Sequence, residues 1–176
     1  MRDLRQFIRD VPDFPKKGVV FRDITPLLMD PAAMADCIRL LGEGMPRPEA
    51  VVAIESRGFV FGTGLAMRWS VPLVPTRKFG KLPGKTVREV YSLEYGEDTL
   101  EIHADALRPG QRVVVVDDVL ATGGTAAATV RLIEQLDARV ESLVFVIELK
   151  GLGGRERLGS YQVRSLVDFE AIDETR

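Results

Sequence analysis

The chain has 176 residues, of which 45% are apolar and 28% charged, a balance typical of a globular protein with a sizeable core. Its net charge of −2 indicates no nucleic-acid or membrane partner through bulk electrostatics, and Cys37, the single cysteine, excludes an intrachain disulfide and a zinc ribbon. No stretch approaches the roughly 18 apolar residues of a membrane span, and residues 1–5 lack the apolar core of a signal peptide, so we expect a cytoplasmic protein.

Apolar periodicity predicts the first elements of the chain. Apolar residues recur with helical spacing over residues 4–11, which predicts a short amphipathic helix that ends before Pro12. Residues 14–26 mix apolar and charged side chains without a period, so we expect irregular structure there. Asp30 and Pro31 form an N-cap and first-turn pair that starts a helix to about Gly42, with Cys37 on its apolar face as a core thiol.

Strands and helices alternate through the rest of the chain, a pattern typical of a parallel α/β sheet. No internal repeat, linker or second domain interrupts it, so we predict one domain over residues 1–176. The predicted strands are 50–54, 71–75, 113–116, 140–149 and 161–167, and the predicted helices are 58–67 and a stretch after the turn at 121–125 that ends near 136.

Residues 77–90 differ from this pattern, because they contain two Gly, one Pro and five basic residues with few apolar anchors. We expect a long mobile loop there, followed by a hairpin of residues 91–95 and 99–103 across Gly96 and Glu97. Only three residues separate Gly80 from Gly84, where a nucleotide P-loop requires four, so an ATPase is excluded.

The run from Val113 to Thr125 carries the strongest functional signal. Its four valines predict a strand buried on both faces, and Asp117 and Asp118 come where that strand is expected to end. Ligands of open α/β sheets bind beyond the carboxyl ends of the strands. The glycine-containing turn that follows leads into a helix N-terminus, whose free N–H groups and positive dipole end suit a phosphate.

The two acids suit another part of the same ligand. They repel phosphate, but they can accept hydrogen bonds from two vicinal hydroxyls such as those of a ribose, or help to hold Mg²⁺ directly or through water. The sequence therefore predicts a ligand with a sugar diol and a phosphate. The alternative is a buried strand, a surface acidic pair and a capped helix.

Two further segments offer basic side chains to an anion. Arg57 follows the strand 50–54 and precedes a helix, where its guanidinium can pair bidentately with phosphate oxygens; the alternative is an exposed turn. Arg77, Lys78 and Lys81 fall in the expected mobile loop, which can act as a lid that neutralises a leaving group and excludes water. The alternative is a solvated basic loop.

Three isolated residues have competing interpretations. Glu94 can act as a proton donor or a hydrogen-bond partner to a ring nitrogen of a base, but the sequence alone favours an outward-facing strand carboxylate. Phe21 can cover a planar base or plug local packing. His103, the only histidine, is expected to be a surface or structural residue.

The run 113–125 closely resembles the signature of the type I phosphoribosyltransferases, which bind phosphoribosyl pyrophosphate (PRPP). Segments 14–26, 55–59, 77–84 and 91–96 extend this resemblance, in the same order, to the adenine phosphoribosyltransferases over nearly the whole chain. The resemblance implies a mostly parallel central sheet flanked by helices, with a small base-binding hood over about 1–30 and a flexible lid over about 77–90.

The resemblance also implies a role for each matched residue, and a non-proline cis peptide in the turn 55–58. Glu94, as the catalytic carboxylate, and Arg57 would be the catalytic residues. Arg77 would reach the site of a neighbouring subunit. The other implied roles are ribose binding by Asp117 and Asp118, 5′-phosphate binding by Ala121, Thr122, Gly123, Gly124 and Thr125, adenine binding by Val20, Phe21 and Arg22, and a pyrophosphate loop and lid of Glu55, Ser56, Arg57, Arg77, Lys78, Lys81 and Tyr91.

The implied reaction transfers the phosphoribosyl group of PRPP to N9 of adenine, giving AMP and pyrophosphate in purine salvage. The expected cofactor is Mg²⁺, bound mainly through PRPP and water, and the expected assembly is a homodimer. Two alternatives are a related enzyme for another 6-substituted purine or xanthine, and a PRPP-sensing regulator without turnover. Such regulators usually carry a DNA-binding segment and a basic face, and this chain has neither spare length nor net positive charge.

Overall fold

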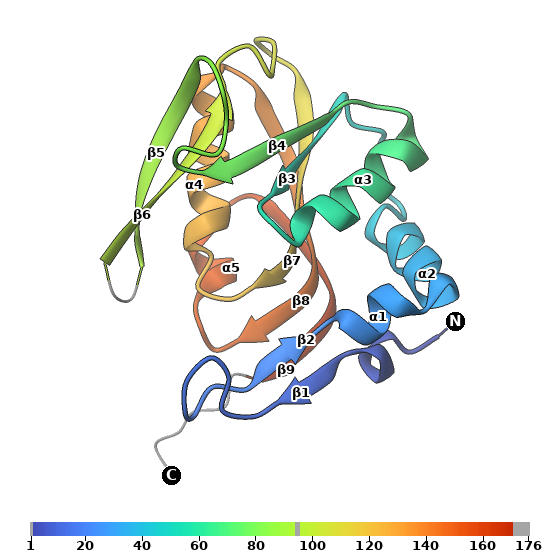
Figure 1. The fold of residues 1–176 in the computed structure, drawn as a ribbon. Helices are drawn as coiled ribbons and strands as arrows, with labels where there is room; N and C mark the ends of the chain where they lie inside the picture. The colour runs from blue at the N-terminus through green and yellow to red at the C-terminus, as the bar shows by residue number, and fades with distance from the viewer. Residues whose placement is uncertain (1, 94–95, 171–176) are drawn as a thin grey trace.

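The computed structural model describes residues 2–93 and 96–170. Its centre is a seven-stranded sheet in the order β5-β6-β4-β3-β7-β8-β9 (Figure 1). Strands β4, β3, β7, β8 and β9 are parallel, whereas β6 runs antiparallel to both β4 and β5. The predicted α/β class with a mostly parallel sheet is therefore confirmed. In the described part of the chain, no helix has the length and apolar character needed to cross a membrane.

The elements have the following bounds. The strands are β1 Arg9–Val11, β2 Phe21–Asp23, β3 Ala50–Ile54, β4 Leu73–Lys78, β5 Thr86–Leu93, β6 Gly96–His103, β7 Arg112–Leu120, β8 Arg139–Lys150 and β9 Gln162–Glu170. The helices are the 3-10 helix η1 Leu4–Phe7, α1 Thr25–Met29, α2 Pro31–Leu41, α3 Gly58–Trp69, α4 Gly124–Gln135 and α5 Gly154–Arg157.

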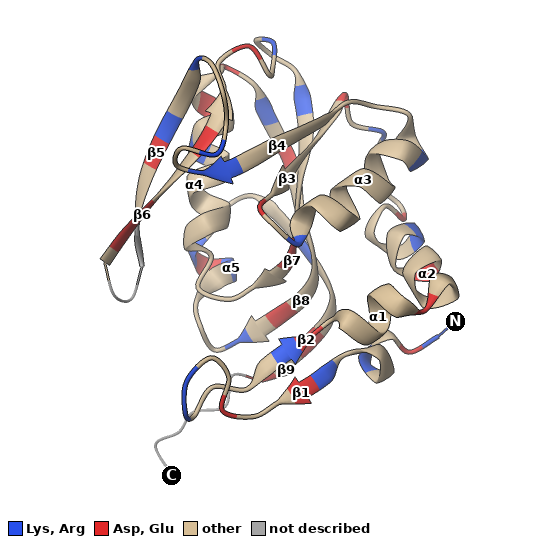
Figure 2. Ribbon diagram, in the orientation of Figure 1, with Lys and Arg blue, Asp and Glu red and all other residues tan. Residues whose placement is uncertain are grey.

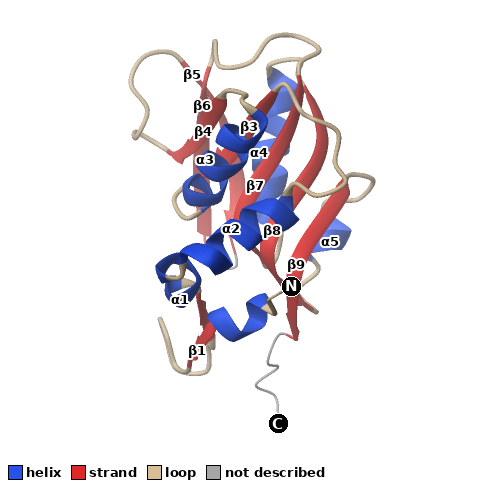
Figure 3. Cartoon of the chain, turned by 90° about the vertical axis from the view of Figure 1, so that its right-hand side faces the viewer, coloured by secondary structure: helices blue, strands red, loops and turns tan. Residues whose placement is uncertain are grey.

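The central strands bury both faces of the sheet. Helices α2 and α3 cover one face, and α4 and α5 cover the other (Figure 3). Side chains of a strand alternate between faces, so Val114 and Val116 pack with the residues of α2 and α3, whereas Val113 and Val115 pack with those of α4. This two-sided burial explains why β7 reads as a continuous valine run.

One glycine and one cysteine mark how tightly the face with α2 and α3 is packed. A Cβ on Gly62 would lie 2.6 Å from the Cβ of Ala53, so the glycine lets α3 lie directly against β3. Cys37 on α2 has no exposed surface, and burial raises the pKa of its thiol to about 12. The predicted core thiol is confirmed.

The N-terminal segment, residues 2–30, differs from its prediction; we call it the hood. The helix expected over residues 4–11 is wrong, because η1 ends at Phe7 and β1 pairs antiparallel with β2. Residues 14–26, expected to be irregular, contain β2 and the start of α1. Ion pairs join the two strands, from Arg9 to Asp23 at 2.5 Å and from Arg22 to Asp10. Such contacts between distant residues leave no trace in local periodicity.

The long loop expected over residues 77–90 is also wrong. Strand β4 continues to Lys78 and β5 begins at Thr86, which leaves residues 79–85 as the connection. The charges of β5 have partners, because Arg88 pairs with Glu101 at 2.8 Å and Glu89 pairs with Arg131 of α4. The expected hairpin is present, but its strands are longer than predicted, and Gly96 and Glu97 belong to β6.

Candidate functional site

The acid pair lies inside β7 rather than after its end, because β7 runs on to Leu120. The ladder between β3 and β7 ends where Ala53 pairs with Val116, while β7 continues to pair with β8 as far as Leu120. Asp117 and Asp118 therefore lie just beyond the last β3 pair, at the carboxyl edge of the sheet where open α/β folds bind ligands.

The two carboxylates are held in an environment that disfavours their charge. Asp117 Oδ1 accepts a hydrogen bond of 2.8 Å from the backbone N–H of Asp118. Burial and the neighbouring charge of Asp118 raise the pKa of Asp117 well above its ordinary value, and burial also raises that of Asp118 against the opposing effect of Arg57. Asp118 Oδ2 forms an ion pair with Arg57 Nε at 2.8 Å. It accepts no hydrogen bond from the described residues. Two hydroxyl donors from a ligand would satisfy this pair.

The turn from Ala121 to Thr125 is the segment predicted to bind the 5′-phosphate; we call it the phosphate loop. Gly123 has a φ of 74° and precedes α4, and no side chain caps that helix. The loop and the adjacent part of β7 line a cavity of about 90 Å³, the volume of roughly three waters. Asp117 lines the same cavity. The structure therefore brings the predicted phosphate-binding and diol-binding residues together.

A second strand-turn-helix unit lies beside the first, where β3 passes through residues 55–57 into α3. The peptide between Glu55 and Ser56 is cis, as expected for this turn. A Cβ on Gly58 would lie 2.9 Å from the carbonyl oxygen of Val116 and 3.0 Å from Asp117 Oδ1, so the backbone of this unit touches the acid pair. Only glycine permits such an approach.

Arg57 connects the acid pair to the hood. Its Nε forms the ion pair with Asp118, and its Cζ lies 5.0 Å from the centre of the Phe21 ring. Phe14 packs edge-on against Phe21 with 5.2 Å between the ring centres. The guanidinium thus lies between the aromatic residue expected to stack on a base and the acid expected to bind the sugar.

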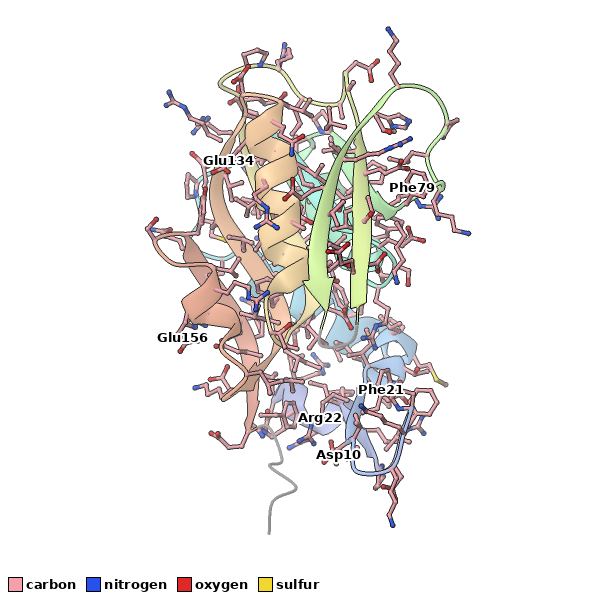
Figure 4. The ribbon with its side chains drawn as sticks, turned by 90° about the vertical axis from the view of Figure 1, so that its left-hand side faces the viewer. Asp10, Phe21, Arg22, Phe79, Glu134 and Glu156 are labelled. Carbon is pink, nitrogen blue, oxygen red and sulfur yellow. The ribbon has the colours of Figure 1, made fainter. Side chains whose placement is uncertain are left out.

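The hood presents Phe21 and its neighbours differently. Phe21 is partly exposed, as is Val20, whereas Arg22 is buried. The Arg22 guanidinium pairs with Asp10 and lies 4.2 Å from the centre of the Phe169 ring on β9 (Figure 4). The Arg22 side chain is therefore committed to packing, which leaves its backbone for any contact with a base.

Basic residues mark the carboxyl end of β4 (Figure 2). Arg77 donates to both carboxylate oxygens of Glu55, at 3.0 and 3.2 Å, and the backbone N–H of Lys78 donates to the same carboxylate at 2.9 Å. Burial opposes ionisation of Glu55, but these donors outweigh it and lower its pKa. Arg77 also donates to the carbonyl oxygen of Lys81 at 3.0 Å, so it binds within its own chain here.

Asp98 is a site neighbour that sequence reasoning missed. Its Oδ2 lies 3.1 Å from Lys78 Nζ and accepts from the Tyr91 hydroxyl at 3.3 Å. Tyr91 is buried and lies 3.5 Å from Thr125 Oγ1 of the phosphate loop, and burial raises its pKa. Tyr91 and Asp98 face each other in the hairpin register, a signal that correct strand bounds would have given.

Glu94 and His103 are the remaining candidates from the sequence. Glu94 lies outside the described residues. His103 Nε2 lies 2.9 Å from the carbonyl oxygen of Pro83, which agrees with the predicted structural role. Within residues 2–93 and 96–170, no group of three or more His, Cys, Asp or Glu side chains could hold a metal. For Mg²⁺, this edge of the sheet offers the oxygens of Asp117 and Asp118, which suit a hard cation whose other ligands are phosphate and water.

Comparisons with known proteins agree with this geometry. A family model described as a phosphoribosyl transferase domain matches residues 27–173. An adenine phosphoribosyltransferase of Carboxydothermus hydrogenoformans is 56% identical over 169 residues, which cover 95% of this chain and 99% of the relative. One from Thermotoga petrophila is 52% identical over 169 residues, with the same coverage.

Solved structures give the same result. The adenine phosphoribosyltransferase of Thermoanaerobacter pseudethanolicus is 49% identical with a TM-score of 0.91, over 94% of this chain and 98% of that one. The Saccharomyces cerevisiae enzyme, crystallised with an imino-altritol bisphosphate and adenine, is 40% identical with a TM-score of 0.87, over 93% and 96% of the two chains. Together with the family model, these relatives show that the chain belongs to the adenine phosphoribosyltransferases of the phosphoribosyltransferase family.

Proposed function

We propose that this protein transfers the phosphoribosyl group of PRPP to N9 of adenine and releases AMP and pyrophosphate, as in purine salvage. The observation that carries the proposal is the meeting of the phosphate loop, the acid pair and the Arg57–Phe21 contact at one edge of the sheet. A PRPP molecule has a 5′-phosphate, a ribose diol and a pyrophosphate, and each has a partner there.

The phosphate loop and the acid pair would orient the ribose. The free N–H groups of α4 and the hydroxyls of Thr122 and Thr125 would bind the 5′-phosphate. Asp117, which is partly exposed, and Asp118, whose buried Oδ2 has no hydrogen-bond donor among the described residues, would accept hydrogen bonds from the two ribose hydroxyls. These contacts would fix C1′ between the leaving group and the base, so that the reaction gains from orientation.

The basic residues would stabilise the departing pyrophosphate. The C1′–O bond breaks with its electron pair going to pyrophosphate, and the sugar develops oxocarbenium character. Arg57, Lys78 and Lys81 carry the charge that would offset the anion, and Arg77 would hold Glu55 and the loop in place or reach a neighbouring subunit. Mg²⁺ would neutralise charge on the leaving pyrophosphate; its ligands would come mainly from PRPP and water, and Asp117 and Asp118 are the residues that would help to hold it.

The hood would present the base. Phe21 would stack on adenine, and backbone groups of Val20, Phe21 and Arg22 would read its edge. The N9 lone pair forms the bond to C1′ as the N9 proton passes to water, and we assign to Glu94 the hydrogen bond to a ring nitrogen of the base that supports this step. No protein nucleophile takes part in this scheme.

Domain organisation, cellular location and assembly complete the proposal. We take residues 1–176 as one domain that works in the cytoplasm and forms a homodimer. Light scattering of the purified protein would test the assembly, since a monomeric mass at working concentration would contradict it.

The function is tested by mixing the protein with PRPP, Mg²⁺ and each of adenine, hypoxanthine, guanine, xanthine and orotate. We expect AMP from adenine alone. A product from another base would be consistent with the proposed PRPP site, but it would overturn the assignment of Phe21 to adenine binding. Measurable PRPP binding without any product would favour the PRPP-sensing regulator. Unchanged turnover of Glu94→Ala would remove Glu94 from the chemistry.

A further inference from the structure

The phosphate loop touches a second loop, residues 151–154, which joins β8 to α5. A Cβ on Gly154 would lie 2.1 Å from the carbonyl oxygen of Ala121 and 3.0 Å from Leu120 Cδ1. A Cβ on Gly123 would lie 2.7 Å from the carbonyl oxygen of Gly154. Neither position has room for a side chain, so the backbone at Gly154 is in direct contact with the phosphate loop at two points, Ala121 and Gly123.

The second loop is itself firmly anchored. Arg155, the residue after Gly154, donates from Nε to Glu148 Oε1 at 3.0 Å and from Nη1 to the carbonyl oxygen of Val163 at 2.8 Å. These contacts tie the start of α5 to β8 and β9 of the sheet. Leu158 at the other end of α5 is buried in the core cluster that contains α4. Figures 1 and 4 show α5 against the end of α4 that the phosphate loop enters.

Open space borders the close contact between Gly154 and Ala121 on one side. A cavity of about 250 Å³ lies next to the contact, and Leu120, Ala121 and Gly154 are among its lining residues. A loop that borders open space on this side depends on its few close contacts for its position. The contact between Gly154 and Ala121 is therefore suited to set where the backbone of the phosphate loop lies.

We propose that Gly154 is a positioning residue for the phosphate loop, and that Arg155 holds Gly154 in place. The second loop, residues 151–154, would pack against the phosphate loop on the side away from the ligand. Its backbone would hold the N–H groups of residues 121–125 at the distance that a phosphate requires. This inference rests on the proposed function of the phosphate loop. It adds residues 154 and 155 to the binding of the 5′-phosphate, although neither touches the ligand.

The test compares Gly154→Ala with the unsubstituted protein by calorimetric titration with ribose 5-phosphate, and separately with pyrophosphate. Gly154 does not have a positive φ, so alanine adds a steric clash and no backbone strain. A displacement near 1 Å can cost on the order of 100-fold at a reacting centre, and we expect the Kd for ribose 5-phosphate to rise about 10-fold or more. Pyrophosphate affinity should stay the same, and in turnover the KM for PRPP should rise more than kcat falls.

Gly42→Ala is the matched control. Gly42 is also buried and crowded, since its Cβ would lie 2.9 Å from the Trp69 ring, but it ends α2 and lies outside both loops. We expect this variant to lose thermal stability without a change in ribose 5-phosphate affinity. An equal effect of both variants on that affinity would reduce Gly154 to a general packing role and overturn the inference.

Arg155→Gln provides a second test if Gly154→Ala does not fold. It releases the anchor and leaves the contacting backbone atoms in place, and we expect a several-fold weaker ribose 5-phosphate Kd with unchanged pyrophosphate binding. Unchanged ribose 5-phosphate affinity in a folded Gly154→Ala or Arg155→Gln overturns the inference, as does an unsubstituted protein that does not bind ribose 5-phosphate. Because the readout is binding, failure to form AMP would overturn the proposed reaction and not this inference.

Discussion

Asp117 and Arg57 show how single residues prepare this site for a ligand at a cost to the free protein. Asp117 is an acid in surroundings that disfavour its charge, beside a second acid. Arg57 offsets part of that cost through Asp118 and at the same time lies over Phe21. A ligand that brings hydroxyl donors and an anionic group would satisfy each of these residues better than they satisfy one another.

We expect Asp117→Asn to raise the stability of the free protein at neutral pH and to weaken PRPP binding. An acid whose pKa is raised on folding, here above 3.8, costs stability as pH rises through the window between the two values, and the cost is complete above the folded pKa. Thermal unfolding should therefore show a higher Tm at pH 7, by about 2–4 °C for each kcal/mol gained.

The gain in Tm should disappear as pH falls below 3.8, because the Asp117 side chain is then neutral in both the folded and the unfolded protein, as the amide of the variant always is. Asp118→Asn is the companion variant, with a smaller gain because it also loses the Arg57 partner. A lower Tm for Asp117→Asn at neutral pH would contradict the assignment of the pair, and so would a PRPP affinity that is retained when Asp117→Asn and Asp118→Asn are combined.

Phe21→Leu tests the base-stacking role. Stacking of a base on an aromatic ring is worth about 1–3 kcal/mol, so we expect the KM for adenine to rise on the order of 10-fold while the PRPP Kd changes little. Phe14→Leu serves as the control, because that ring meets Phe21 edge-on and is half exposed. If PRPP binding changed and the adenine KM did not, Phe21 would act through Arg57 instead.

At the scale of elements, charge pairs between distant residues define the parts of the fold that local pattern did not show. Strand β5 carries Arg88 and Glu89, which pair with β6 and α4, and the sequence therefore resembled a solvated loop. Strand β7 was predictable because both of its faces are buried, and its unbroken run of four valines is typical of such a strand. The end of β7 was misplaced because its pairing with β8 outlasts its pairing with β3.

Asp23 joins two elements of the hood and gives a test by acid. Its Oδ1 accepts from the backbone N–H and the hydroxyl of Thr25, at 2.9 and 2.6 Å, and its Oδ2 pairs with Arg9. The hydrogen bonds from Thr25, followed by that from Arg9, lower its pKa to about 2. Since Arg9 is exposed and solvent screens the pair, we expect Asp23→Ala to cost about 1–2 kcal/mol at pH 7.

The sign of the pH effect follows from the lowered pKa. The contribution of Asp23 is complete above pH 3.8 and is lost as pH falls from there to about 2. Urea unfolding of both proteins between pH 7 and pH 2 should show the difference in free energy shrink in that window. A difference in free energy that does not change with pH would assign the loss to packing instead. As a control, Thr25→Ala keeps the ion pair between Asp23 and Arg9, and we expect it to lose less free energy of unfolding than Asp23→Ala.

At the scale of the whole molecule, the last strand holds the first segment. Phe169 on β9 lies under two cations of the hood, with Arg5 Cζ 4.6 Å and Arg22 Cζ 4.2 Å from its ring centre. Arg5 also donates to the backbone carbonyl of Asp168. The candidate binding residues on β7 could be found in one short run of sequence. The contacts of β9 with Arg5 and Arg22 could not be found in this way, because the partners are separated by most of the chain and an Arg or Phe is not distinctive by itself.

Phe169→Ala should loosen the hood and spare the sheet. Each cation–π contact is worth about 0.5–2 kcal/mol, so we expect faster tryptic cleavage after the exposed Lys17 and a higher KM for adenine, with PRPP affinity retained. Phe169→Tyr keeps the aromatic face and should behave as the unsubstituted protein. Equal cleavage rates for all three proteins would show that other contacts hold the hood.

The burial of Cys37 gives the molecule a reporter that requires no label to be engineered. As the single thiol in the sequence, with no exposed surface and a pKa of about 12, it should not react with alkylating reagents while α2 stays packed. Its rate of modification in native buffer would therefore follow the opening of the core between α2 and the sheet. Ligands that bind only the folded state should slow that reaction in proportion to their occupancy, so thiol chemistry can measure PRPP binding without following turnover.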